Sequence, residues 1–292
     1  MIIDCHMHLN QNMLSLPKML AGMNANGIDK TVLIADMVES FSLGTWPERA
    51  GVDLLRLGLY YFNPLGRSAC DMLTIDKKGH FVLLGKKYRI IAKPDNAAVA
   101  AAIEEHPDRF MGWMFINPSA DPDYMSELER WSSNPAMIGV KAHPFWHDYP
   151  VRLLEPAAAW CRERGYPMLI HLGSRRGSGD YRRLPEKYPG LKIVYAHAGI
   201  PYFRKLWAYI RDMKDVHVDL SSVYLDRKLV RKAVDFLGPG KCLYGTDGPY
   251  SRKPVGEDYD YGWIKGWVES LPLSDREREM IFGGNFQALR KR

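Results

Sequence analysis

The segment Ile2–His8, IIDCHMH, begins the chain and predicts its first β-strand. Side chains of a strand alternate between two faces, so His6 and His8 project from the same face, with Asp4 beside them. Neutral imidazole binds zinc, iron, nickel and similar ions, and two imidazoles on one rigid strand can begin a metal site. One His-X-His pair is weak evidence by itself, so the other ligands must come from the rest of the chain.

Seven further β-rich segments follow, separated by helical patterns, which is typical of repeated βα units around a parallel sheet. A helix is expected near 17–26, ending at Gly27, and another is expected to open at Asp121, with Pro122 at its first position. Eight strands with intervening helices within 292 residues predict an α/β fold, a (β/α)8 TIM barrel. The expected strands are 2–8, 30–36, 110–116, 137–143, 168–171, 191–197, 216–221 and 241–247.

The regular spacing breaks once, at an insertion of about 57 residues, 37–93, after the second strand. A loop of that length without structure is unusual in a compact domain, and 79–85 predicts one strand of a small hairpin. Because the insertion follows a strand, it should emerge at the C-terminal face, where barrel enzymes have their active sites. We therefore expect a single domain over 1–292, with the insertion forming a lid or a substrate wall.

The formal net charge of +6 invites a nucleic-acid hypothesis, but the basic residues are spread over most of the chain. A small anionic substrate or solubility explains the charge as well, so no nucleic-acid partner is expected. No apolar run reaches the roughly 20 residues of a membrane helix, and no secretory signal is visible.

The four cysteines are scattered without CxxC spacing, which favours buried free thiols in a reducing compartment. We therefore expect a cytoplasmic protein without a membrane partner. The four are Cys5, Cys70, Cys161 and Cys242.

Polar side chains recur at the C-terminal ends of five of the expected strands. Buried polar groups without partners cost about 1–3 kcal/mol each, and a purely structural core would not repeat that cost at one end of the barrel. We therefore interpret the set as functional. Its members are His6, His8, Lys141, His143, His171, His197 and Asp247.

With these motifs the sequence resembles the amidohydrolase superfamily, and more narrowly the branch that includes aminocarboxymuconate-semialdehyde decarboxylase and the resorcylate decarboxylases. The matching stretches follow the family's order and cover nearly the whole barrel except the 37–93 insertion. The resemblance implies a metal-dependent enzyme, in a branch whose members are often homodimers. The stretches are Asp4–His8, Gly139–Pro144, Ile170–Gly173, Ala196–Gly199 and Tyr244–Pro249.

The same resemblance implies that one divalent ion, most often zinc, is held by His6, His8, His171 and Asp247. Three neutral imidazoles leave such an ion strongly Lewis acidic, and it lowers the pKa of a coordinated water to about 7. Asp247 can then take a proton from that water, while His197 holds the water or stabilises charge on the substrate. Asp247 and His197 are therefore the expected catalytic residues.

Lys141 has two readings. In binuclear relatives a lysine on the fourth strand is carbamylated and bridges two metals, whereas in the mononuclear branch an uncarbamylated lysine can pair with a substrate carboxylate. The Gly-Val-Lys-Ala-His-Pro setting favours the mononuclear reading. His143 shares a face with Lys141, and substrate contact and structural hydrogen bonding are equally expected for it.

Arginine binds carboxylate or phosphate in a bidentate manner, and several arginines follow the later strands. Arg175 and Arg176 lie in a Gly/Ser loop after the fifth strand and are expected to bind an anionic substrate. Arg252 is a further candidate, whereas Arg182 and Arg183 are weaker ones, and an ordinary surface loop remains the alternative.

Two aromatic residues, Trp146 and Tyr250, can provide walls of the site, although packing in the core or at the rim explains them as well. Asp219 and Ser221 on the seventh strand can orient metal ligands from behind.

Metal-assisted hydrolysis of a small, carboxylated amide, lactone or ester is the primary functional prediction. The close alternative is a metal-dependent, non-oxidative decarboxylase of an aromatic or muconate-like acid, because the same ligands serve both reactions. A non-catalytic metal- or nucleic-acid-binding barrel and a metal-free lactonase are more distant alternatives, because the chain contains every expected ligand.

Overall fold

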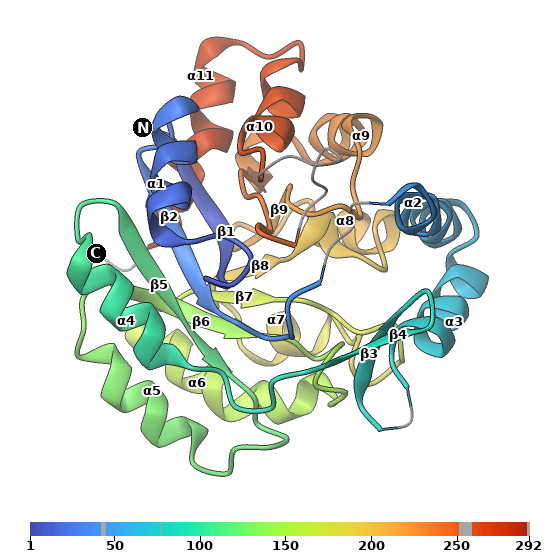
Figure 1. Cartoon of the computed structure of the whole chain (residues 1–292), viewed down its shortest axis with the longest axis horizontal. Helices are drawn as coiled ribbons and strands as arrows, with labels where there is room; N and C mark the ends of the chain where they lie inside the picture. The colour runs from blue at the N-terminus through green and yellow to red at the C-terminus, as the bar shows by residue number, and fades with distance from the viewer. Residues whose placement is uncertain (42–44, 77, 251–258, 291–292) are drawn as a thin grey trace.

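The computed structural model describes residues 1–41, 45–76, 78–250 and 259–290. Eight parallel strands form one sheet in the order β1-β2-β5-β6-β7-β8-β9-β10, with helices around it (Figure 1). The predicted α/β TIM barrel is confirmed. The strands are β1 Ile3–Leu9, β2 Lys30–Ala35, β5 Phe110–Ile116, β6 Met137–Ala142, β7 Met168–Ile170, β8 Ile193–Tyr195, β9 Val216–Asp219 and β10 Cys242–Leu243.

Backbone hydrogen bonds join the last strand to the first and so close the barrel. The amide of Cys5 donates to the carbonyl of Tyr244 at 3.1 Å, and the amide of Asp247 donates to the carbonyl of His6 at 2.6 Å. The eighth strand, β10, ends at Leu243 rather than at Asp247 as predicted, and Asp247 itself has a positive φ of 57°, outside the extended range. Closure therefore brings the two ends of the sequence into one site.

The strands of the sheet are buried almost throughout, as expected where helices cover a parallel sheet. Trp113 on β5 is fully buried and donates from its indole nitrogen to the carbonyl of Cys5 at 2.9 Å. A Cβ at Gly139 on β6 would lie 2.3 Å from the Trp113 ring, so only glycine fits beside this indole.

None of the described helices is both long enough and apolar enough to cross a membrane. The helix expected at Asp121 instead begins at Tyr124, because the Asp121 carboxylate accepts the amide of Asp123 at 3.1 Å and forms a turn ahead of the helix. The helices outside the insertion are α1 Leu16–Ala25, α4 Asn96–Glu105, α5 Tyr124–Ser132, α6 Glu155–Arg164, α7 Arg183–Lys187, α8 Arg204–Ile210, α9 Arg227–Leu237, α10 Gly262–Glu269, α11 Asp275–Glu279 and α12 Asn285–Leu289.

The 37–93 insertion forms a helical hairpin, α2 Trp46–Tyr61 and α3 Asn63–Thr74, followed by a β-hairpin, β3 His80–Leu83 and β4 Lys86–Arg89. A Cβ at Gly66 would lie 2.3 Å from the carbonyl carbon of Gly58, so glycine permits the close approach of α2 and α3. Leu84 and Gly85 both have positive φ, 47° and 81°, and make the two-residue turn between the strands.

All four cysteines are free and buried, as predicted. Burial raises the pKa of Cys70 and of Cys242 to about 12, and it also raises the pKa of Cys5 and of Cys161. At pH 8 these thiols therefore remain protonated and shielded from solvent. Because the thiolate is the reactive form of cysteine, all four should react slowly.

We expect an aromatic disulfide reagent at pH 8 to label almost no thiol in the native protein and four thiols per chain in denaturant. The absorbance of the released thiolate gives both counts. Stoichiometric labelling of any cysteine within minutes under native conditions would contradict the packing described above.

Candidate metal centre

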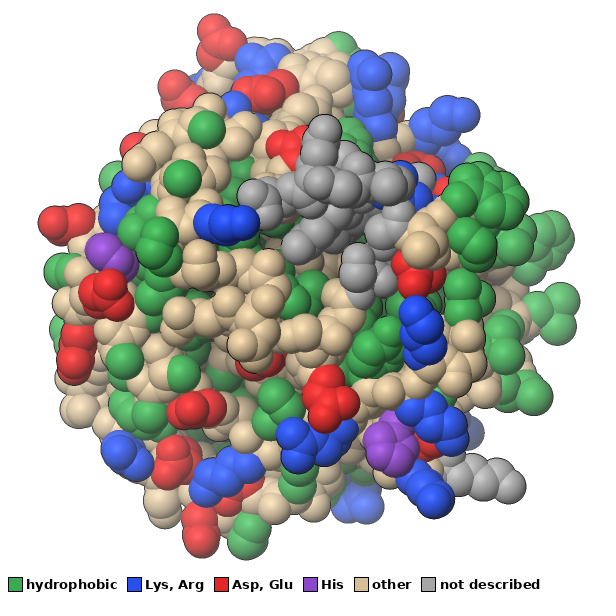
Figure 2. Space-filling model, in the orientation of Figure 1, with side chains coloured by type: hydrophobic (Ala, Val, Ile, Leu, Met, Phe, Trp, Pro, Cys, Tyr) green, Lys and Arg blue, Asp and Glu red, His purple; other side chains and the backbone are tan. Residues whose placement is uncertain are grey.

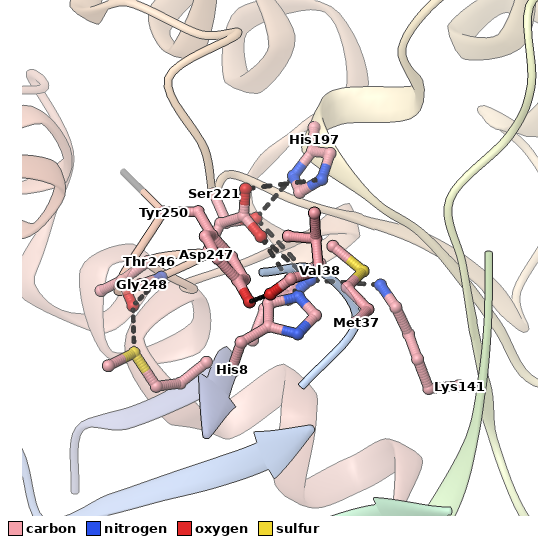
Figure 3. Close-up of polar contacts among 12 residues, drawn as sticks. His8, Met37, Val38, Lys141, His197, Ser221, Thr246, Asp247, Gly248 and Tyr250 are labelled. Atoms are coloured by element: carbon pink, nitrogen blue, oxygen red, sulfur yellow. Dashed lines mark hydrogen bonds and ion pairs between the residues drawn. The ribbon is translucent and has the colours of Figure 1, made fainter. Parts of the chain in front are cut away.

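Three of the four expected ligands converge where β1 meets the segment after β10. The Nε2 atoms of His6 and His8 lie 3.4 and 3.5 Å from the Oδ1 atom of Asp247 (Figure 3). One potential ligand atom from each of the three lies within 4.8 Å of the others, and all three residues are buried. Two imidazoles and a carboxylate at this spacing are a donor set suited to a divalent ion such as zinc.

The fourth expected ligand, His171, lies close to this cluster but outside it. Its ring centroid is 4.8 Å from that of His197, and both of its ring nitrogens are buried without a hydrogen-bond partner among the described residues. The Nε2 atom of His8 is likewise without a hydrogen-bond partner. Buried polar atoms are normally satisfied, and a metal ion would satisfy one ring nitrogen of His171 and Nε2 of His8, so the residues fit the group that the resemblance implies.

Asp219 at the end of β9 fixes the proton positions of two of the histidines. Its Oδ2 atom lies 2.9 Å from Nδ1 of His6, and its Oδ1 atom accepts the hydroxyl of Ser221. The Ser221 oxygen in turn lies 2.8 Å from Nδ1 of His197. Both imidazoles therefore carry their proton on Nδ1 and leave the Nε2 lone pair directed toward Asp247, the arrangement that a metal ligand or a proton acceptor requires.

The imidazoles of His6, His171 and His197 are neutral at physiological pH. Burial holds the pKa of His6, of His171 and of His197 well below the usual range, and the nearby Lys141 lowers the pKa of His6 further. Metal ions bind the neutral form of imidazole, so the environment favours coordination over protonation.

Lys141 lies at the bottom of the same site, fully buried, with its Nζ atom 3.2 Å from Nε2 of His6. Burial lowers the pKa of Lys141 to about 8. His143 accepts the backbone amide of Trp146 on its Nδ1 atom at 3.0 Å, so its neutral ring carries the proton on Nε2. Each side chain therefore offers a nitrogen-bound proton, Lys141 from Nζ and His143 from Nε2.

The backbone is strained where the site residues leave their strands. His197, Ser222 and Asp247 have positive φ values of 55°, 88° and 57°, which cost about 1–3 kcal/mol each for residues other than glycine. Such strain persists where the surrounding structure enforces it and is concentrated at functional sites. The constellation is thus held in place by the fold.

The expected arginines lie elsewhere. Arg175 is exposed and binds the carboxylate of Asp148 through two contacts of 2.8 Å. Arg176 is also exposed and lines a separate surface hollow with Arg67 and Arg182. The turn at 173–179 closes on itself, because the Gly173 amide donates to the carbonyl of Ser178 at 2.9 Å, and neither Arg175 nor Arg176 lines the cavity above the candidate ligands. Arg252 lies outside the described residues.

A cavity opens above the candidate ligands, and most of its wall is apolar. Lys141, His143, Trp146 and Tyr250 all line it, as does the insertion. The sequence did not identify the apolar residues of the insertion as part of the site, because their spacing is the same as that of ordinary core positions. The full lining is His6, Met37, Phe41, Gly51, Val52, Leu55, Leu73, Thr74, Phe81, Val82, Leu83, Leu84, Lys141, His143, Trp146, His171, His197, Ser222, Val223, Tyr224, Asp247 and Tyr250.

Comparison with solved structures finds the same barrel at low sequence identity. An uncharacterized TIM-barrel protein from Bordetella bronchiseptica is 18% identical, with 99% of this chain and 97% of that chain covered and a TM-score of 0.64. A dihydroxybenzoic acid decarboxylase from a Polaromonas species, with bound manganese and the inhibitor 2-nitroresorcinol, is 15% identical, with 99% and 96% covered and a TM-score of 0.61. A protein from Pseudomonas putida, provisionally named 2-pyrone-4,6-dicarboxylic acid hydrolase, is 17% identical, with 99% and 96% covered and a TM-score of 0.60.

No curated protein matches this chain. The family model described as Amidohydrolase matches residues 70–289, which include β5 to β10 and the site residues Lys141, His171, His197 and Asp247. The chain therefore belongs to the amidohydrolase family.

Proposed function

We propose that this protein is a zinc-dependent hydrolase that cleaves a carboxylated amide, lactone or ester. The observation that carries the proposal is the convergence of His6, His8 and Asp247 beside a buried His171 that has no hydrogen-bond partner. When bound, a zinc ion polarises a carbonyl group and lowers the pKa of water to about 7, so that a nucleophile is available at neutral pH.

Asp247 and the residues around the ligands provide proton transfer, hydrogen bonding and substrate binding. Asp247 accepts the proton of the attacking water and returns it to the leaving group. Its carboxylate is placed for this role among the histidines, with Oδ1 facing His6 and His8 and Oδ2 3.8 Å from Nε2 of His197. His197 accepts a hydrogen bond through Nε2, because Ser221 holds the proton on Nδ1. Lys141 binds a substrate oxygen, and its buried position excludes water from that contact.

The apolar wall favours a second candidate, a metal-dependent decarboxylase. A carboxylate in an apolar cavity loses its hydration, and its departure as neutral carbon dioxide relieves that cost. The Polaromonas neighbour is a decarboxylase. Asp247 or His197 would then deliver a proton to the carbon that loses carbon dioxide.

Elemental analysis of protein purified without chelator is expected to find about one divalent ion per chain, with zinc predominant. Two ions per chain would instead support a bridging, carbamylated Lys141. If no ion binds even after incubation with zinc or manganese, metal-dependent chemistry is excluded.

The products then separate the two reactions. Hydrolysis in water enriched in oxygen-18 places the isotope in a product carboxylate, whereas decarboxylation releases carbon dioxide and incorporates one solvent hydrogen. A panel of amides, lactones, esters and aromatic acids, with mass spectrometry as the readout, distinguishes these outcomes.

A further inference from the structure

The two ends of the active-site cavity differ sharply in polarity. The inner end, at the strand termini, presents the candidate ligands and Lys141. The outer part comes largely from the insertion, in which Thr74 is the one polar side chain among the described lining residues, and Thr74 donates its hydroxyl to the carbonyl of Cys70. The described part of that wall therefore offers a ligand mainly apolar contact.

Four aromatic rings connect these two ends. Phe41 stacks on Tyr250 with ring centroids 5.2 Å apart, and Phe81 stacks on Trp146 at 4.8 Å. Phe41 and Phe81 are themselves 5.0 Å apart, and Tyr250 lies 5.3 Å from His8. The aromatic row thus runs from the metal centre to the insertion and provides a continuous apolar surface for a substrate.

The cavity opens to solvent through apolar side chains. Leu73 at the end of α3 and Leu84 in the β3–β4 turn both line it, and they are 67% and 60% exposed. Figure 2 shows hydrophobic side chains gathered over α2 and α3. Large exposed hydrophobic residues within the described ranges, Met1 and Phe236 apart, all belong to the insertion: Trp46, Leu54, Leu57, Tyr61, Phe62, Leu65, Met72, Leu73 and Leu84.

Among the described lining residues, positive charge is limited to the inner end of the cavity. Of the described lining residues, Lys141 is the one with a cationic side chain, and it lies at the base. A second carboxylate, placed farther out, would lose its hydration without gaining a cationic partner, which is strongly unfavourable.

We propose that the substrate of this site is a monoanion with one polar head at the metal centre and a bulky apolar body, aliphatic or aromatic, that extends along the insertion to Leu73 and Leu84. This inference rests on the proposed function for the position of the head. The insertion sets specificity through burial of apolar surface, which stabilises binding in proportion to the area covered.

Calorimetric titration of zinc-loaded protein with butanoate, hexanoate and octanoate tests the inference without turnover. We expect the affinity to rise roughly three- to four-fold per added methylene, and octanedioate to bind roughly 100-fold more weakly than octanoate. Affinity independent of chain length, or equal binding of octanoate and octanedioate, would overturn the inference.

Matched double variants locate the effect. Leu73→Asp/Leu84→Asp is expected to reduce the gain from hexanoate to octanoate to less than two-fold, whereas Leu54→Asp/Met72→Asp leaves it unchanged. All four side chains are exposed, and Leu54 and Met72 do not line the cavity, so both proteins should fold and melt alike. An equal loss in the two variants would contradict a specific role of the cavity mouth.

The metal content, measured on the same preparations, separates this inference from the proposed function. Protein that binds no metal yet shows the chain-length dependence supports the apolar site and refutes the metal-dependent reaction. Protein that binds one ion but shows no chain-length dependence refutes the apolar-substrate inference alone.

Discussion

The Asp247→Asn variant is expected to lose at least about 1000-fold in kcat/KM and to bind zinc more weakly than the unchanged protein. Within the part of the chain that the structure describes, Asp247 is the one carboxylate that faces His6, His8 and His197 together, at 3.4 to 3.8 Å. Asparagine keeps the shape of the side chain but removes the charge that attracts the ion and the group that accepts the proton. The weaker binding of the ion and the loss of the proton acceptor both slow the attack of water, so this variant combines the two effects.

The measurement pairs steady-state kinetics with a zinc dissociation constant from competition with a chelating dye. Asp235→Asn serves as the control, because Asp235 is an exposed aspartate on α9 whose partner, Arg231, lies on the same helix. The control should retain the activity and affinity of the unchanged protein. Activity of the Asp247→Asn variant within three-fold of normal would rule out Asp247 as the proton acceptor.

The barrel could be predicted from the sequence because its strands are short, buried and regularly spaced. Polar side chains at the ends of such strands can only meet at one face of a closed sheet, which made the positions of His6, His171, His197 and Asp247 predictable. The sequence predicts the start of α5 at Asp121, ahead of its observed start at Tyr124, because it does not reveal the local turn in which the Asp121 carboxylate accepts the amide of Asp123 before the helix begins.

The substrate side of the site was not predictable in the same way. The position of Arg175 in the loop after β7 predicts that it lies at the active face, but the turn at 173–179 closes on itself and Asp148 pairs with the guanidinium. A loop's direction depends on such tertiary contacts, which leave no periodic signal in the sequence. Leu73 and Leu84 illustrate the same difficulty, because their place at the cavity mouth depends on how the insertion folds over the barrel.

For Asp219, the sequence predicts the kind of role but not how many residues depend on it. The sequence suggests a group that orients ligands, yet the structure shows one buried carboxylate that serves two histidines. Its Oδ1 atom accepts the amides of His197 and Ser221 at 2.9 and 3.0 Å, in addition to the Ser221 hydroxyl. Its Oδ2 atom faces His6.

This geometry predicts that Asp219→Asn weakens zinc binding by roughly 10- to 100-fold and lowers turnover at saturating zinc. The asparagine oxygen must remain toward the three donors at Oδ1, so its amide group replaces Oδ2 and faces Nδ1 of His6. Two donors cannot face each other, and His6 must therefore move its proton to Nε2, the nitrogen that is directed at Asp247.

The Ser221→Ala variant acts mainly on His197, because it removes the 2.8 Å contact to His197 and a longer, 3.3 Å contact to Nδ1 of His6, but leaves the 2.9 Å Asp219–His6 pair in place. We expect it to lower turnover while the zinc dissociation constant stays within about three-fold of normal, since His6 keeps its tautomer. His217→Gln controls for the loss of a buried side chain on β9, as His217 lies on the same strand outside the cavity. If Asp219→Asn and Ser221→Ala changed zinc affinity equally, the carboxylate would not act through His6, and its role would be limited to holding the β9 terminus.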